Sequence, residues 1–248
     1  MRTSKIHLTV VCHVQPKIMA VSLIRLMATA GEPIASAVFI DNFWPIDREE
    51  TSRDIETLAK AYGAAVTRPA GGRNIGGHQG GNLAIDFLRP VLQRDDLILG
   101  FDPDSFPLDY GWLAAAKTVM LNSDLDSVSL IHTAIINRPW QFQIINGIKV
   151  GSLPFPEMYN VTVWRAGWLL DNKLAGSGFY GHVESALHHK NKHGYLLEYA
   201  ESHHPIPHPE IYVEWKRVHA SGEYKGNFDQ FVVTTKSPLL NTTNMATR

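Results

Sequence analysis

LILGFDPD, residues 97–104, joins a run of apolar residues to two aspartates that flank a proline. The apolar run predicts a buried strand over 97–101, and the polar residues after it predict a turn. Pro103 disfavours the helical conformation for Asp102, and residues two apart in an extended segment point in the same direction. The carboxylates of Asp102 and Asp104 can therefore face one cation, and Mg²⁺ and Mn²⁺ prefer such oxygen ligands.

Strands and helices alternate along the chain before and after this segment. Apolar residues recur at period two in residues 6–14 and at helical spacing in residues 18–30. The alternation continues with strands over 35–41 and 64–68 and with helices over 50–62, 82–92 and 110–121. This order predicts an α/β fold of the Rossmann-like kind, in which helices flank a mostly parallel central sheet.

The second half of the chain has a different pattern, which predicts a smaller α+β part built onto the same sheet. Its expected elements are strands over 127–134, 161–165 and 195–200, a loop over 140–158 and a short helix over 182–193. We accordingly expect a single domain with a first half over 1–125, a second half over 126–215 and a C-terminal tail over 216–248.

Composition and charge exclude several classes of protein. The 248 residues include 23 basic and 24 acidic ones, and the net charge of −1 offers no general attraction for nucleic acid. Cys12 is the single cysteine, which excludes intrachain disulfides and four-cysteine zinc sites. No apolar run reaches the roughly 18 residues of a membrane helix, and no signal peptide is readable, so we expect a cytoplasmic protein.

Polar residues follow three of the expected strands at the point where each ends. They are Asp41-Asn42, the glycine-rich segment 71–81 and Asp102–Ser105. The carboxyl ends of parallel strands meet at one edge of a sheet, where open α/β sheets bind their ligands. Each cluster alone is also compatible with a solvated turn. The glycine-rich segment has neither the spacing of a dinucleotide fingerprint nor the Lys-Ser/Thr pair of a P-loop, which argues against both classes of protein.

In order and spacing, these segments resemble the consecutive signatures of GT-A-fold glycosyltransferases, especially family 2. The matching segments are 39–42 (FIDN), 74–82 (NIGGHQGGN), 100–104 (GFDPD), 181–187 (GHVESAL) and 193–195 (HGY). Together they cover roughly residues 5 to 205. The resemblance implies a GT-A-type fold with a nucleotide-sugar-binding half over 1–125 and an acceptor and catalytic half over 126–215.

The resemblance also implies roles for the residues that match. Asp41 would contact the base or ribose of the nucleotide, and Asn74 and Gly76 would line the donor pocket. Asp102 and Asp104 would hold the diphosphate of the donor through Mn²⁺ or Mg²⁺, with Asp104 as the preferred direct ligand.

Three further residues complete the expected site. Glu184 stands where inverting members of the family place their catalytic base, and a carboxylate suits the removal of a proton from a sugar hydroxyl. Arg73 is a candidate for offsetting the charge that develops on the leaving diphosphate. Family members often place a metal-ligating histidine after the strand that follows the acidic helix, so His203 or His204, with His204 preferred, is expected in the metal site.

The sequence therefore predicts a metal-dependent glycosyltransferase that moves a sugar from a nucleoside-diphosphate sugar to a hydroxyl acceptor, with inversion at the sugar. The acceptor would be a glycan, a lipid-linked molecule or a small molecule, and no nucleic acid is expected as a partner. A lipid-linked acceptor would require peripheral contact with a membrane or a partner protein, and the formation of a homo-oligomer stays open.

Two other interpretations remain. The first is a nucleotide-sugar-binding module that keeps the donor pocket but has lost catalysis. The reduction of the family's acidic pair to one carboxylate, Glu184, permits this interpretation. A zinc hydrolase would use His182, Glu184 and His188, of which the last two share a helix face. A nucleotidyltransferase would need a glycine-rich, basic loop after the first strand, which the sequence lacks.

Large aromatic residues are frequent in the second half. Trp140, Phe142, Phe179 and Tyr180 are candidates for an acceptor groove, because sugar rings stack on aromatic faces. Core packing is the favoured interpretation for Trp164.

Overall fold

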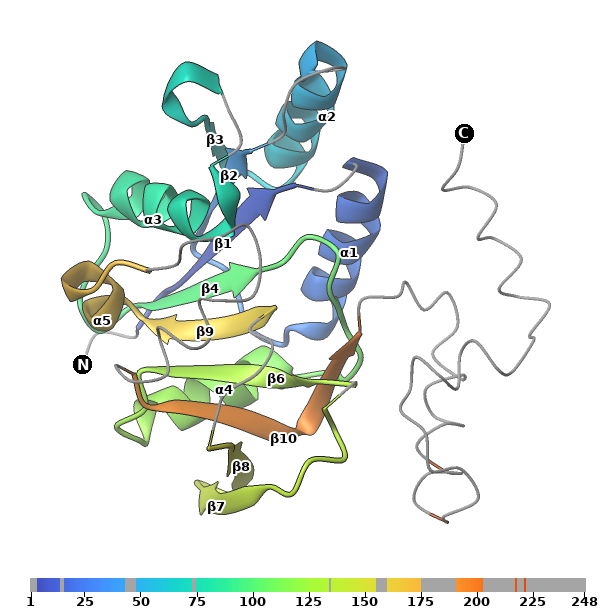
Figure 1. Cartoon of the computed structure of the whole chain (residues 1–248), viewed down its shortest axis with the longest axis vertical. Coiled ribbons are helices and arrows are strands. Elements are labelled where there is room, and N and C mark those ends of the chain that lie inside the picture. Colours follow the sequence, from blue (N-terminus) through green and yellow to red (C-terminus); the bar gives the residue numbers. More distant parts are fainter. Residues whose placement is uncertain are drawn as a thin grey trace.

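Figure 1 shows the computed structural model, which describes residues 4–13, 16–42, 48–72, 75–133, 135–154, 160–174, 191–202, 217 and 221. Its strands are β1 Ile6–Cys12, β2 Ser36–Asp41, β3 Ala65–Thr67, β4 Leu97–Phe101, β5 Phe106–Pro107, β6 Ser127–His132, β7 Gln141–Ile145, β8 Ile148–Ser152, β9 Val161–Arg165 and β10 His193–Ser202. Its helices are α1 Pro16–Thr29, α2 Arg48–Ala61, α3 Gly76–Leu88, α4 Trp112–Leu121 and α5 Ala166–Asp171, with a short 3-10 turn at Ala70–Gly72.

The described strands form one mixed sheet in the order β3-β2-β1-β4-β9-β6-β10-β8-β7, and β5 pairs with β10 outside this path. β1 is parallel to both β2 and β4, and β2 is parallel to β3. β9 pairs antiparallel with β4 and β6, while β10 is parallel to β6. The predicted α/β fold is confirmed: its first half is the expected parallel sheet, and the second half extends this sheet with mixed pairings.

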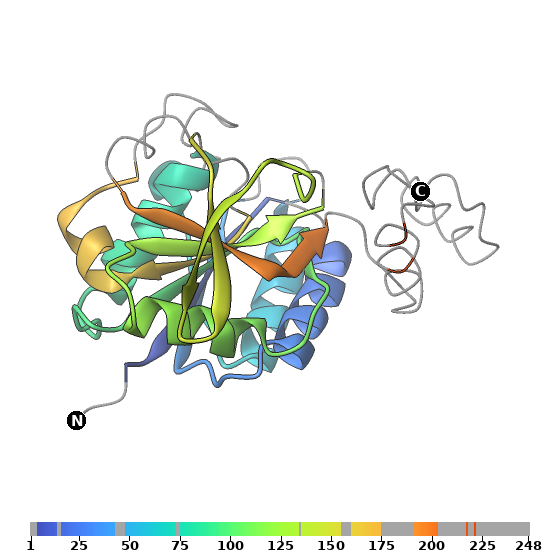
Figure 2. The same cartoon turned by 90° about the horizontal axis from the view of Figure 1, so that it is seen from below.

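Helices cover both faces of the sheet, as Figure 2 shows. On one face, α1, α2 and α4 pack on the sheet through a cluster that includes Leu23 and Ile55. On the other face, α3 and α5 pack through a second cluster that includes Ile85. Phe39 belongs to the first cluster and its neighbour Ile40 to the second, so β2 is buried on both sides. Burial on both faces explains why β2 and β4 are nearly continuous apolar runs in the sequence.

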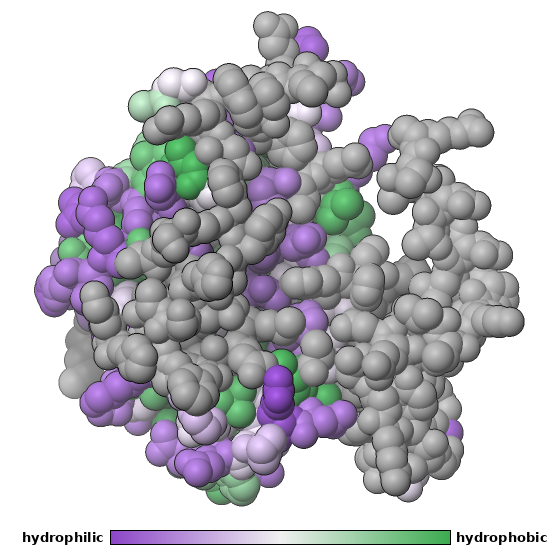
Figure 3. All heavy atoms as spheres, viewed as in Figure 1, coloured by the Kyte–Doolittle hydropathy of each residue, from purple (hydrophilic) through white to green (hydrophobic). Residues whose placement is uncertain are grey.

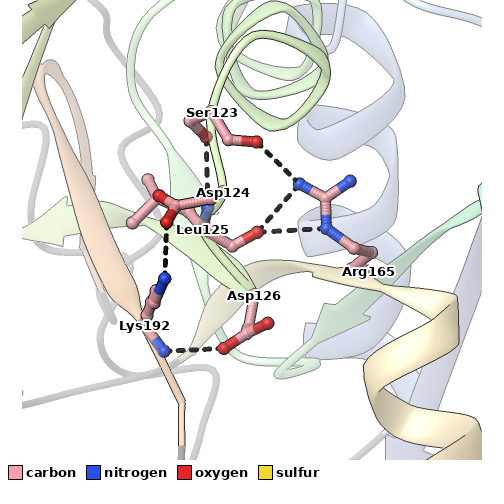
Figure 4. A network of polar contacts seen from close by, with 6 residues as sticks. All are labelled: Ser123, Asp124, Leu125, Asp126, Arg165 and Lys192. Atoms are coloured by element: carbon pink, nitrogen blue, oxygen red, sulfur yellow. Dashed lines mark hydrogen bonds and ion pairs between the residues drawn. The ribbon is translucent and has the colours of Figure 1, made fainter.

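A network of polar contacts joins the second-half strands at one end (Figure 4). The guanidinium of Arg165, at the end of β9, donates two hydrogen bonds of 3.2 and 2.9 Å to the carbonyl of Leu125, which precedes β6. The backbone N–H of Lys192, just before β10, donates to Asp126 at 2.8 Å, and its ammonium pairs with Asp124. These contacts join β9, β6 and β10 at the end of the sheet where β6, the middle strand of the three, begins.

α3 begins at Gly76, well before the helix expected over 82–92. Glycine is a poor helix former, so the sequence between 76 and 81 contains no helical signal. The packing explains these glycines: a Cβ at Gly80 would lie 2.6 Å from Val11 Cγ1, and one at Gly81 would lie 2.9 Å from Leu174. α3 therefore approaches β1 more closely than any side chain at position 80 would allow.

The loop expected over 140–158 was a wrong prediction for its first part, which is a hairpin of β7 and β8. The hairpin turns at Asn146-Gly147, where φ is 49° and 83°. Asn-Gly between two strands favours this kind of turn, because both residues tolerate positive φ. The sequence does contain this signal, since polar and apolar residues alternate from Gln141 to Ile144 before Asn-Gly, although all four residues are exposed.

β10 begins at His193, so the last residue of the helix expected over 182–193 belongs to a strand, and residues 182–190 lie outside the described part of the chain. A Cβ at Gly194 would lie 2.7 Å from Val150 Cγ1, which shows that this glycine is needed for packing between strands. The register of β10 on β6 breaks between Leu196 and Ala200, and β10 bends in Figure 1. After the bend, β10 pairs with β5.

The outer face of α1 is apolar. The surface in Figure 3 is mainly hydrophilic where it is coloured, with apolar atoms over the position of α1. Ile18, Val21, Ile24 and Met27 of this helix are between 37% and 62% exposed. None of the helices in the described ranges is both long and apolar enough to cross a membrane.

A buried carboxylate joins β1 to β4 at the amino-terminal edge of the parallel strands. Asp96 accepts hydrogen bonds from the backbone N–H groups of Lys5, at 3.0 Å, and Gln93, at 2.9 Å, and Oδ2 lies 3.4 Å from His7 Nε2. Burial raises the pKa of Asp96, but the hydrogen bonds and His7 outweigh burial and hold the pKa below its ordinary value. The fold thus satisfies both oxygens of this carboxylate.

Asp96→Asn is expected to lower the free energy of unfolding by about 1–3 kcal/mol at neutral pH, because an oxygen that accepts a buried N–H is replaced by a donor. A carboxyl whose pKa is lower in the folded state stabilises the fold above its unfolded pKa of about 4, and this contribution disappears as the pH falls through the folded pKa. In urea unfolding, the difference between parent and variant should therefore stay constant down to about pH 5 and shrink as the pH falls further, through about 4 and below. A constant difference would contradict this role of Asp96.

Candidate functional site

The carboxyl ends of β1, β2 and β4 lie together at one edge of the sheet. Val10 pairs with Phe101, so the residues that follow β1 and β4 are neighbours. His13 follows β1, Asp41 ends β2 and Asp102 follows β4. The parallel sheet therefore gathers polar residues from distant parts of the sequence at one edge, as the strand-end clusters predict.

His13, Asp102 and Asp104 form a compact cluster, in which one ligand atom of each residue lies within 4.8 Å of the others. His13 Nε2 lies 3.2 Å from Asp102 Oδ1, and the side chains of both residues are about 30% exposed. The Oδ1 atoms of Asp102 and Asp104 are inaccessible to solvent and have no hydrogen-bond partner among the described residues. Carboxylates suit Mg²⁺ and Mn²⁺, and imidazole is a common metal ligand, so this donor set fits a divalent cation.

The orientation of His13 supports a ligand role for its outer nitrogen. Nδ1 lies 2.9 Å from the carbonyl oxygen of Val11, and a carbonyl can only accept, so Nδ1 carries a proton. In the neutral imidazole, Nε2 then presents a lone pair to the carboxylate of Asp102. Two acceptors that face each other need a proton or a cation between them. A histidine held by a backbone carbonyl through its other nitrogen is the usual arrangement of a metal ligand.

The electrostatics of the aspartates agree with this arrangement. Burial raises the pKa of Asp102 to about 7, with Asp104 adding to the shift and His13 opposing it. Two carboxyl groups that meet in a partly buried place cannot both be ionised without a compensating positive charge. The cluster therefore favours either a shared proton or a bound cation.

The turn that carries both aspartates is held by its backbone. The N–H of Asp102 donates to the carbonyl of Asn160, at 2.7 Å, and the N–H of Ser105 donates to the carbonyl of Asp102, at 2.9 Å. The hydroxyl of Ser22 on α1 donates to the carbonyl of Ser105. The 102–105 turn is thus closed by one internal hydrogen bond and bound to two other parts of the chain, Asn160 and α1, which limits the positions that its carboxylates can take.

Asp41 is buried and uses one of its oxygens within the protein. Oδ2 accepts hydrogen bonds from Ser52 Oγ, at 2.6 Å, and from Arg68 Nε, at 2.9 Å, and Arg68 also pairs with Glu56. These contacts attach α2 to β2. Oδ1 is buried with no hydrogen-bond partner in the described ranges, and it is the atom left for a ligand.

Asn42 fixes the start of the glycine-rich helix beside β2. Its Oδ1 accepts a hydrogen bond of 2.9 Å from the N–H of Ile75, and its Nδ2 donates to the carbonyl of Gly76, at 3.5 Å. Gly76 has a φ of 77°, which favours glycine. Gly76 is thus held beside the carboxyl end of β2.

Several predicted site residues fall outside the described residues, and their predicted roles are not tested by the structure. They are Arg73, Asn74, Phe179, Tyr180, His182, Glu184, His188, His203 and His204.

The remaining aromatic candidates occupy two kinds of environment. Trp164 is 6% exposed and belongs to the core, as expected. Trp140 packs against the ring of Tyr195, with the ring centroids 5.0 Å apart, so it too contributes to packing. Phe142 is 55% exposed, and the ammonium of Lys149 lies 4.3 Å from its ring centroid. Of these three residues, Phe142 presents the most surface to a ligand.

The structure adds two residues that the sequence interpretation missed. His13 was passed over, although its position directly after the first strand is itself a signal, since that strand must end at the ligand-binding edge. Glu201, at the end of β10, is completely buried, and both its oxygens lack a hydrogen-bond partner among the described residues. Burial and the charges of Asp102 and Asp104 raise the pKa of Glu201 well above its ordinary value. No pattern in the sequence around position 201 indicates this proximity.

Comparisons with known proteins give matches at the level of structure alone. No protein-family model matches the chain, and no curated protein matches it either. Residues 1–349 of S. aureus TarS match with a TM-score of 0.56 and 12% identity, over 79% of this chain and 60% of TarS 1–349. The complex of the same TarS fragment with UDP matches with a TM-score of 0.54 and 14% identity, over 80% and 60% of the two chains.

A second protein gives the same result. GalNAc-T7, solved with UDP, GalNAc and Mn²⁺, matches with a TM-score of 0.57 and 10% identity, over 81% of this chain and 44% of GalNAc-T7. The chain therefore spans less than two thirds of the length of these structures. Both proteins are GT-A-type glycosyltransferases, and at such low identity the likeness concerns the fold. The large mixed sheet with helices on both faces is thus a GT-A-type fold.

Proposed function

We propose that the protein is a metal-dependent glycosyltransferase that moves a sugar from a nucleoside-diphosphate sugar to a hydroxyl acceptor. The observation that carries the proposal is the cluster of His13, Asp102 and Asp104 at the carboxyl edge of a GT-A-type sheet. Two structures with this fold contain UDP, and one of them also contains Mn²⁺. The coincidence of a divalent-cation donor set with this fold favours a nucleotide sugar over other ligands.

In this proposal, Asp102 and Asp104 hold Mn²⁺ or Mg²⁺ together with His13. The bound ion supplies positive charge to the diphosphate of the donor. His204 remains the residue that the family resemblance implies as a further ligand. The assignment of the first three ligands is supported by the orientation of the imidazole and by the buried Oδ1 atoms of Asp102 and Asp104, which accept no hydrogen bond from the described residues.

The donor pocket of the proposal lies beside the cation site. Oδ1 of Asp41 is assigned to the base or ribose, because it is buried with no hydrogen-bond partner in the described chain. Gly76 and Asn74 line the pocket. The hydrogen bond from Asn42 to the carbonyl of Gly76, at the start of α3, supports this placement of Gly76. Arg73 offsets charge on the leaving diphosphate.

Glu184 is the proposed general base. The acceptor hydroxyl attacks the anomeric carbon, its proton passes to the Glu184 carboxylate, and the bond from the anomeric carbon to the diphosphate oxygen breaks. Attack from the face opposite the leaving group inverts the configuration of the sugar.

The acceptor is proposed to be a glycan, a lipid-linked molecule or a small molecule. The exposed ring of Phe142 supports a sugar-binding role for the hairpin, since sugars stack on aromatic faces. The apolar outer face of α1 is compatible with the proposed peripheral membrane contact or with a homo-oligomer.

Mn²⁺ titration tests the cation site directly. The parent is expected to bind Mn²⁺, and Asp104→Asn and His13→Ala are each expected to weaken binding by at least about tenfold, because each removes a ligand. Isothermal titration calorimetry gives the dissociation constants. Asp86→Asn, an acid on the outer side of α3 that pairs with Arg89, is the control and should bind like the parent. Variants of His13 and Asp104 that bind Mn²⁺ as tightly as the parent would refute the proposed site.

A thermal-shift panel of UDP-, GDP-, dTDP- and CMP-sugars, with and without Mn²⁺, identifies the donor, because a tight ligand stabilises the native state. We expect one nucleotide class to raise the melting temperature, and to do so only with the metal. Glu184→Gln is then expected to keep this shift and to lose sugar transfer by at least about a hundredfold, since it removes a general base.

The thermal-shift panel, combined with assays of sugar transfer and of zinc content, separates the rival functions. Donor binding with no transfer, and a Glu184→Gln variant that behaves like the parent, would identify a binding module. Tightly held zinc that is lost on His188→Ala, with no response to any sugar nucleotide, would identify the zinc hydrolase.

A further inference from the structure

Glu201 is a buried acid for which the proposed transfer reaction has no direct use. Its exposed fraction is 0%, and neither of its oxygens has a hydrogen-bond partner in the described part of the chain. Asp96, at the opposite edge of the sheet, is equally buried but accepts hydrogen bonds at both oxygens. A native fold rarely leaves a buried polar group unsatisfied, and such groups call for a functional explanation.

The backbone around Glu201 leaves its carboxyl little freedom. Its carbonyl accepts a hydrogen bond of 3.0 Å from the N–H of Thr133, and Glu201 pairs with His132 of β6 on one side and with Pro107 of β5 on the other. The preceding residue, Ala200, pairs its carbonyl with the N–H of Leu108 at 2.9 Å. The strand is therefore fixed on both sides, which restricts where the carboxyl can lie.

Two polar side chains connect Glu201 with the turn that carries the aspartates. Ser105 and Asn160 approach its carboxyl closely enough to lower its pKa by hydrogen bonding, although burial and the charges of Asp102 and Asp104 have the opposite and larger effect. Ser105 Oγ and Asn160 Nδ2 are themselves buried, and within the described ranges no contact of either atom meets the geometry of a full hydrogen bond. Hydrogen bonds of a site are often poorly aligned without its ligand and tighten when the ligand binds.

Both of these neighbours are also bonded to Asp102. The carbonyl of Asn160 accepts the N–H of Asp102 at 2.7 Å, and the N–H of Ser105 donates to the carbonyl of Asp102 at 2.9 Å. Ser105 and Asn160 thus contact Glu201 with their side chains and Asp102 with their backbones. A shift of the Glu201 carboxyl would therefore be passed to the turn that presents Asp102 and Asp104.

We propose that Glu201 is a positioning residue of the cation site, which accepts hydrogen bonds from Ser105 and Asn160 and thereby holds Asp102 and Asp104 toward one ion. The inference rests on the cation site of the proposed function. It assigns to β10 a part in metal binding that is independent of the histidines after that strand.

The test compares Glu201→Ala with Glu201→Gln in Mn²⁺ binding, measured by calorimetry on protein that is folded in circular dichroism. Glu201→Ala removes both acceptors and is expected to weaken Mn²⁺ binding by about 10- to 100-fold, the usual effect of losing a residue that orients metal ligands. Glu201→Gln keeps the size and one acceptor, and its affinity should return close to that of the parent. Asp96→Asn is the matched control: it should lower stability and leave the affinity unchanged, because its contacts lie at the other edge.

Three outcomes would overturn the inference. They are a folded Glu201→Ala variant with the affinity of the parent, a Glu201→Gln variant as weak as Glu201→Ala, and a loss of affinity that Asp96→Asn reproduces. If Glu201→Ala does not fold, Ser105→Ala and Asn160→Ala remove the same contacts from the other side, and unchanged Mn²⁺ affinity in both would overturn it instead.

The experiments distinguish a failure of the role of Glu201 from a failure of the proposed function. If Asp104→Asn abolishes Mn²⁺ binding and the Glu201 variants do not change it, the cation site stands and only the role of Glu201 fails. If Glu201→Ala weakens binding while no sugar nucleotide is bound or consumed, the positioning role stands and the transferase proposal fails.

Discussion

The parallel pairing of β1 with β2 and β4 is the constraint on which the candidate site depends. The register of β1 on β4 ends with Val10 opposite Phe101, which brings His13 next to Asp102 across almost ninety positions of sequence. The pairing is stabilised by apolar side chains buried on both faces of the sheet, and the polar residues of the site lie where the strands end. A change of register by one residue would turn these side chains to the other face and separate the three ligands.

Buried acids at the two edges of the parallel strands differ in their hydrogen bonding and in the direction of their pKa shifts. At the amino-terminal edge, Asp96 is fully hydrogen-bonded and its pKa is lowered. At the carboxyl edge, the pKa values of Asp102 and Glu201 are raised, and oxygens of Asp102, Asp104 and Glu201 lack hydrogen-bond partners among the described residues. The first arrangement stabilises the fold, whereas the second brings acidic groups together at the expense of stability. This contrast is typical of a site that awaits a positively charged ligand.

The sequence predicted what depends on local pattern and missed what depends on packing. Strands β4 and β9 were predicted with their observed bounds, and the polar residues after β4 indicated the cation site. The early start of α3 was missed because the close approach of Gly80 to Val11, which explains its glycines, is a tertiary contact. His13 was missed because a single histidine after a strand is an ordinary residue until the partner strand is known. Glu201 could not be predicted, since a bend in β10 and its pairing with β5 decide where it lies.

The bend in β10 divides this strand into two segments that pair with different strands. The segment before the bend pairs with β8 and so carries the β7–β8 hairpin, while the segment after it pairs with β5 and holds Glu201. Because the register is interrupted between Leu196 and Ala200, a displacement in the hairpin is not transmitted rigidly to the acids. The hairpin can therefore diverge in length and composition among descendants of this chain, or be exchanged by protein engineering, while the chemistry at the far end of the strand is preserved.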